Sequence, residues 1–170
     1  NVTPGTANKL AFTVQPSAVV AGAAIAPAIQ VTVQDAQGNT VTTATTSVAL
    51  AITTGTGTSG AGPGGTAAVA AVAGVATFAN LTVDKAGTGY TLTASATSLT
   101  SATSTAFAVR PGAASKLACT VQPGAVVAGA SSPRIKGWAV VAQGNTVASA
   151  TTSVTLDITT GTGASGAVLG

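Results

Sequence analysis

The sequence predicts an all-β chain whose strands form an antiparallel β-sandwich, and three observations predict it. Apolar and polar residues alternate along short segments, which is the two-residue period of a strand with one buried face. Clusters of Gly, Pro, Ser and Asn separate these segments, as turns do. The same run of segments occurs twice in the 170 residues. We therefore expect tandem sandwich modules, one complete and one partial.

The predicted strands of the first copy each have one apolar face. In chain order, the residues expected to point inward are Leu10, Phe12 and Val14; Ile29, Val31 and Val33; Val48, Leu50 and Ile52; Ala76 and Phe78; Leu81 and Val83; Tyr90 and Leu92; and Phe107 and Val109. The alternation changes phase between Phe78 and Leu81, which predicts a bulge or a corner there. The Ala-rich segment 66–76 has helix propensity, but its valines and glycines favour strand or loop.

The repeat sets the expected module boundaries. ANKLAFTVQPSAVVAGA, starting at Ala7, matches ASKLACTVQPGAVVAGA, starting at Ala114, and ATTSVALAITTGTGTSGA matches ATTSVTLDITTGTGASGA further along each copy. The opening NVTPGTANKL also resembles AVRPGAASKL, at the join between the copies. We therefore expect 1–6 to be the tail of a preceding module, 7–111 a complete module, and 112–170 the first half of a second module in a longer array.

The composition leaves little material for catalysis or metal binding. Charged residues make up 5% of the chain, His, Glu and Met are absent, and the acids are Asp35, Asp84 and Asp157. A Ser–His–Asp triad, a Cys–His pair or a zinc site needs residues that the chain lacks or has once. We therefore predict that the protein is not an enzyme and needs no cofactor or metal.

The charge and hydropathy patterns also exclude two classes of partner. The Lys and Arg residues are scattered and are not interleaved with aromatic residues, so we expect no nucleic-acid partner. The most apolar segment, AAVAAVAGVATFA at 67–79, is shorter than the roughly 18–20 residues of a membrane-spanning helix. We therefore expect no membrane span in this chain.

The stretch VQDAQGNTV at 33–41 returns as VVAQGNTV in the second copy, and it predicts a structural turn. Gly38 can adopt a positive φ without strain, while Asp35 and Asn39 can hydrogen-bond to nearby backbone. The alternative is a cation site, but calcium needs several oxygen ligands, and Val141 stands in the second copy where the first has Asp35.

Two further motifs have a structural interpretation beside a functional one. In DKAGTGYTLTAS, the spacing of Asp, Gly and Tyr90 predicts a tyrosine corner, in which the phenol bonds to upstream backbone; the alternative is a ligand-stacking aromatic. GTGTSGAGPGG at 55–65 has the glycines of a phosphate loop, but no Gly-Lys-Ser/Thr follows it, so we expect a flexible loop.

Together these residues resemble a known family. VTVQDAQGNTV, followed by GVATFANLTVDKAGTGYTLTAS, is similar to the bacterial Ig-like repeats of the invasin and intimin type, which share the pattern V-D-x-x-G-N-x-V, G-x-A-x-F and D-x-A-G-x-Y-x-L-x-A. The resemblance covers the first copy and the first half of the second. It implies an Ig-like β-sandwich, turn roles for Asp35, Gly38 and Asn39, the corner role for Tyr90, and no catalytic residue. Such repeats mostly serve as stalks of surface proteins, which implies an extracellular or cell-surface location.

The second copy departs from this pattern at SSPRIKGWAVVAQGN. Gly137 and Ala139 stand where valines are expected, and Trp138 falls on the face opposite the core. Either the strand slips by one residue and brings Trp138 inward, or the face packs against something else. Trp138 is also a possible contact residue. Cys119 takes the position of Phe12, so we expect a small buried thiol.

These observations predict a structural module that serves as a stalk or filament element through contacts between modules. Residues 114–170 lack counterparts of Phe78, Tyr90 and Phe107, so we expect either downstream sequence or strands from another subunit to complete them. The alternative function is an adhesin or carbohydrate-binding module that recognises a surface ligand, with Trp138 as the contact aromatic.

Overall fold

The chain is an all-β antiparallel sandwich, as the alternation predicts. The computed structural model describes residues 3–122, 124–125, 130 and 134–157, and no helix occurs in these residues. The strands are β1 (Lys9–Val14), β2 (Val19–Val20), β3 (Ile29–Gln34), β4 (Ser47–Ile52), β5 (Pro63–Gly64), β6 (Ala68–Ala70), β7 (Val75–Phe78), β8 (Thr82–Val83), β9 (Gly87–Tyr90), β10 (Leu92–Ser95), β11 (Ala102–Thr103), β12 (Phe107–Arg110), β13 (Lys116–Val121) and β14 (Lys136–Val140).

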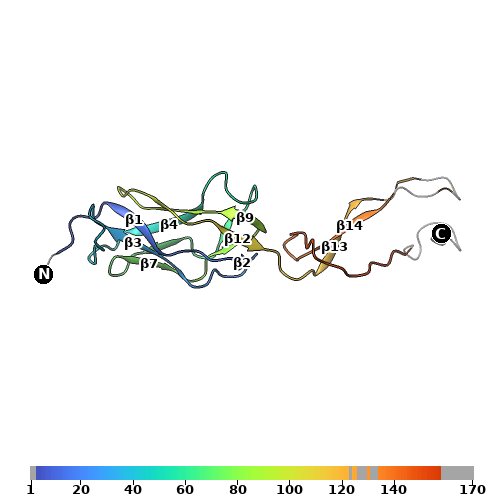
Figure 1. The fold of residues 1–170 in the computed structure, drawn as a ribbon, viewed down its shortest axis with the longest axis horizontal. Coiled ribbons are helices and arrows are strands. Elements are labelled where there is room, and N and C mark those ends of the chain that lie inside the picture. The colour runs from blue at the N-terminus through green and yellow to red at the C-terminus, as the bar shows by residue number, and fades with distance from the viewer. Residues whose placement is uncertain (1–2, 123, 126–129, 131–133, 158–170) are drawn as a thin grey trace.

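Residues 7–111, the first repeat, form the two layers of the sandwich (Figure 1). One layer has the strand order β1-β3-β7. The other has the order β11-β10-β4-β6 and continues through β2-β12-β9, because only Thr91 separates β9 from β10. Neighbouring strands are antiparallel except for β2 and β12, which run parallel.

The predicted inward faces meet in one core. Val31 and Val33 of β3 pack in the same buried cluster as Val48 of β4 and Phe78 of β7, and all four side chains are fully buried. Burying a side chain of this size contributes roughly 1.5–3 kcal/mol. Phe12 is only partly buried, whereas Leu10 on the same strand is buried.

The two ambiguous segments of the first repeat are both extended. The phase change after Phe78 is a corner: the chain bends at 79–80, and Leu81 is again fully buried. The Ala-rich segment 66–76 contains β6 and the start of β7, so its valines and glycines outweigh the helix propensity of alanine.

In the second repeat, which the structure describes as far as residue 157, β13 and β14 reproduce the pairing of β1 and β3. Leu117 pairs with Ala139 as Leu10 pairs with Val33, and both pairs of strands have the same irregularity two to four residues later. Trp138 pairs with Ala118, as Thr32 pairs with Ala11. The interpretation that this strand slips by one residue is therefore wrong, and Trp138 stays on the face opposite Ala139.

The second repeat leaves the sandwich at the end that carries β2, β9 and β12, far from the end where the chain enters it (Figure 1). Residues 1–2 of the predicted tail and 158–170 of the predicted half module lie outside the described residues. In the part of the chain that the structure describes, no helix has the length and apolar character needed to cross a membrane.

Candidate functional site

The predicted turn, residues 35–39, is built around the carboxylate of Asp35. The backbone turn closes through Gly38 N, which donates to Asp35 O at 3.1 Å, and Gly38 has a φ of 94°. Asp35 Oδ1 accepts from the backbone N of Gln37 at 3.0 Å and of Asn39 at 2.8 Å. The carboxylate thus supplies acceptors that a tight loop cannot find in a strand ladder.

The same carboxylate ties the turn to the segment that precedes β1. Gly5 N donates to Asp35 Oδ2 at 2.9 Å, and Asn39 Nδ2 donates to the same oxygen at 2.9 Å. These hydrogen bonds, first that of the Asn39 side chain and then that of Gly5, lower the pKa of Asp35 from 3.8 to about 2, although its burial acts in the opposite direction. All the partners are donors, so the arrangement stabilises a turn and offers no ligand set for a cation.

Tyr90 has the hydrogen bond that defines a tyrosine corner. Its hydroxyl donates to the backbone O of Lys85, five residues upstream, at 2.8 Å. The ring is fully buried and lies 5.8 Å from that of Phe107, centroid to centroid. The side chain therefore has no exposed face on which a ligand could stack.

The glycine-rich loop 55–65 covers the Tyr90 corner. A side chain at Gly57 would collide with the Tyr90 ring, so this close approach requires glycine. Thr58 Oγ1 donates to Ala86 O at 2.7 Å, and Gly62 N donates to Asp84 Oδ1 at 2.8 Å. The loop is thus held against the 84–90 segment by hydrogen bonds and is not arranged around a phosphate.

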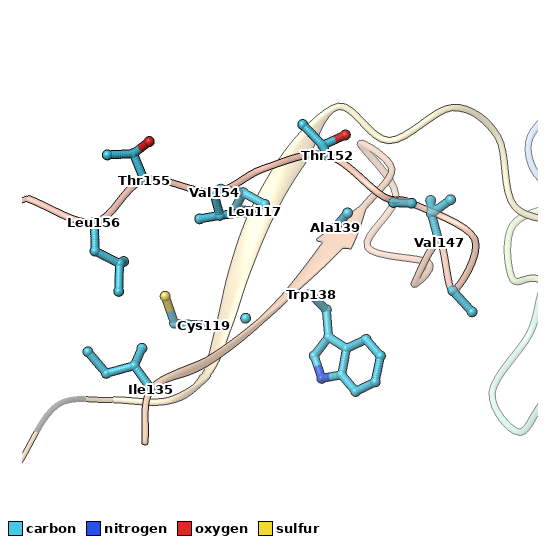
Figure 2. A pocket seen from close by; sticks show the side chains of 13 residues that line it. Leu117, Cys119, Ile135, Trp138, Ala139, Val147, Thr152, Val154, Thr155 and Leu156 are labelled. Atoms are coloured by element: carbon cyan, nitrogen blue, oxygen red, sulfur yellow. The ribbon is translucent and has the colours of Figure 1, made fainter. Parts of the chain in front are cut away.

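The inner face of the second repeat is open and forms a cavity of about 490 Å³ (Figure 2). Its walls include Leu117, Cys119, Gly137, Ala139, Val154 and Leu156. Val154 and Leu156 are each 54% exposed, whereas their counterparts Val48 and Leu50 are 0% and 3% exposed in the first repeat. The same apolar face is therefore packed in one repeat and accessible in the other.

Two predicted residues of this region lie differently from what the sequence suggests. Cys119 is exposed, so the expectation of a buried thiol is wrong for the described residues: the strands that cover Phe12 have no counterpart over Cys119. Trp138 is 50% exposed; it lines an edge of the cavity, and its indole projects from β14 away from Thr152 and Val154 (Figure 2). It is a side chain that a partner can reach.

The described residues contain no group of three or more His, Cys, Asp or Glu side chains able to hold a metal ion. Comparison with known proteins adds no relative, because no model of a known family matches the chain and no curated protein is significantly similar to it. The site that the structure offers is therefore a set of surfaces: the turns, the open face and the exposed Trp138.

Proposed function

We propose that this chain is a structural, extracellular module of a bacterial surface repeat protein, which acts as a stalk or filament building block. The observation that carries the proposal is the repetition of one strand pairing: β13 and β14 keep the register of β1 and β3, and they follow β12 after a five-residue connection, 111–115. A chain that repeats one folding unit at short intervals gains length with each copy.

The side-chain chemistry also supports a mechanical role. Asp35 and Tyr90, the polar residues that the sequence singles out, are each engaged in bonds that fix a turn or a loop. An acid–base pair or an activated nucleophile would need partners that the composition does not provide.

Small-angle scattering of the 170-residue chain tests this function. A compact domain of this length has a radius of gyration of roughly 15 Å. For a spacer we expect a clearly larger value and a pair-distance distribution with a long tail. A radius near the compact value would contradict the proposal.

The proposed contact between copies is strand addition to the open face of the second repeat. In the first repeat β7 pairs with β3 and places Phe78 in the core, but among the described residues β14 pairs with no strand other than β13. An unpaired strand edge beside an apolar cavity accepts an added strand through backbone hydrogen bonds. The proposed donor is a β7-type strand from a neighbouring module or a second copy.

A peptide of residues 74–81 tests strand addition directly. We expect it to bind the chain and to shift the emission of Trp138, the only Trp, while a peptide of the same composition in scrambled order does not. Sedimentation should show association of the chain that the peptide competes away. A well-folded monomer that ignores the peptide would overturn this contact.

The alternative function is an adhesin or carbohydrate-binding module, and the exposure of Trp138 favours it. An aromatic side chain that is half exposed can stack on the apolar face of a sugar or insert into a protein surface. Binding to a glycan array that is lost in Trp138→Ala, with unchanged scattering, would support recognition over the spacer role.

A further inference from the structure

The turn at residues 141–145 of the second repeat has the same backbone as the turn at 35–39 of the first. Val141 N donates to Asn145 O at 3.0 Å, as Asp35 N donates to Asn39 O at 3.0 Å. Gly144 and Gly38 both have positive φ, 86° and 94°. The backbone turn therefore does not require a carboxylate at this position, although the Asp35 carboxylate adds hydrogen bonds to the first turn.

What differs between the two turns is the partner of the Asn side chain. In the first turn, Asn39 Nδ2 donates to the Asp35 carboxylate. In the second turn the side chain of Val141 offers no acceptor, and the Asn145 amide reaches the first repeat instead. Asn145 Nδ2 donates to Asp84 O at 2.9 Å, and Asn145 Oδ1 accepts from Ala86 N at 2.9 Å.

Apolar contacts accompany this amide bridge. Val140 and Val141 are 4% and 3% exposed, and they are the only described residues of 112–157 that are buried. Gly112 in the connection lies between valines of the two repeats: a Cβ there would be in ordinary van der Waals contact with Cγ1 of Val20, at 3.5 Å, and with Cγ1 of Val141, at 3.8 Å. The best-packed part of the second repeat is thus the part that faces the first.

The Asp84 and Ala86 backbone is itself rigidly placed. It flanks Lys85, whose carbonyl accepts the Tyr90 hydroxyl, and Ala86 O accepts from Thr58 Oγ1. The Asn145 amide, which bonds to Asp84 O and Ala86 N on either side of Lys85, is therefore attached to the tyrosine corner of the preceding repeat. That corner is anchored in the core of the repeat through the buried Tyr90 ring.

We propose that the turn at 141–145 is a docking loop, that its partner is the tyrosine-corner segment 84–86 of the preceding repeat, and that valine instead of aspartate at position 141 selects docking. The occupant of each surface is thus a copy of the same repeat. The inference rests on the proposed spacer function and deepens it, because a docked joint fixes the orientation of one repeat relative to the next. If the joint proves to be a hinge instead, the spacer function itself is not contradicted.

Pulsed electron paramagnetic resonance on the full chain tests the joint. One nitroxide label goes on the native, exposed Cys119 and the second on Thr77→Cys, on the exposed side of β7. We expect one narrow distance peak in the parent chain. Asn145→Ala removes the bridge, and Val141→Asp supplies a carboxylate that can hold the Asn145 amide as Asp35 holds Asn39, so both should lose the narrow peak.

Asn39→Ala is the matched control, because it makes the same change in a turn whose amide bonds within its own repeat. It should keep the narrow peak. Far-UV circular dichroism checks that each variant stays folded. A broad distribution in the parent chain, or narrow peaks in both Asn145→Ala and Val141→Asp, would overturn the docking joint, even where scattering still supports an elongated particle.

Discussion

Replacing Tyr90 with Phe tests whether the tyrosine corner stabilises the first repeat. The substitution keeps the ring against Phe107 and removes only the hydroxyl that donates to Lys85 O at 2.8 Å. The carbonyl of Lys85 then lacks its donor beneath a loop that excludes water from the ring, since Gly57 contacts the ring directly.

The expected cost follows from this geometry. A hydrogen bond contributes about 1 kcal/mol net, and leaving a buried partner unsatisfied costs about 1–3 kcal/mol. For a repeat of roughly 100 residues, 1 kcal/mol shifts the melting temperature by about 4–8 °C. We therefore expect Tyr90→Phe to lower the free energy of unfolding by about 1–3 kcal/mol and the melting temperature by at least about 4 °C.

Urea unfolding followed by far-UV circular dichroism measures the change. Trp138, the only Trp, provides a fluorescence signal from the second repeat, so it separates an effect on the corner from a general loss of structure. Thr77→Val removes a hydroxyl from an exposed position and should change stability by less than about 0.5 kcal/mol. If Tyr90→Phe changes stability as little as this control, the corner hydrogen bond does not hold the loop.

Three further predictions concern the turn, the glycine loop and the open face. Because the pKa of Asp35 is lowered to about 2, the unfolded chain binds up to about one more proton than the folded chain between pH 4 and 2. The free energy of unfolding should therefore decrease as the pH is lowered from 4 to 2. Urea titrations at several pH values should show a smaller decrease in Asp35→Asn. Gly57→Ala should destabilise the protein more than Gly55→Ala does. Both glycines have a positive φ, which costs an alanine about 1–2 kcal/mol, but only an alanine at position 57 would collide with the Tyr90 ring. Equal melting temperatures of the two variants would contradict this. Cys119 should react with a thiol reagent in dilute native protein as fast as in urea, and strong protection would show that its face is covered.

The sequence predicts the sandwich core well because each inward face depends on a local pattern. Val31 and Val33 are buried as their alternation requires, and the Asp–Gly–Tyr spacing places Tyr90 where its hydroxyl meets upstream backbone. The turn at 35–39 is equally local: a Gly that needs positive φ and an Asp that bonds two and four residues ahead. Such features need no knowledge of the neighbouring layer.

The features that the sequence does not predict depend on distant segments. The loop at 55–65 has no periodicity, so nothing in it indicates that Gly57 packs on a ring thirty residues later. Cys119 has a core pattern but lies exposed, because burial requires strands from elsewhere in the fold. Asn145 matches Asn39 in sequence, yet its hydrogen-bond partners are about sixty residues away.

Position 35 and its counterpart 141 show how one side chain can decide whether a repeat end is self-contained. The Asp35 carboxylate accepts from the Asn39 amide, so that amide is satisfied within its own repeat, and it also accepts from the Gly5 backbone in the segment that precedes β1. The side chain of Val141 has no acceptor, and an amide left unpaired at a partly covered joint costs about 1–3 kcal/mol. The Asn145 amide avoids this cost by bonding to the preceding repeat. We therefore expect aspartate at this position to hold the Asn amide within its own turn, and valine to leave that amide free to bond to the preceding repeat.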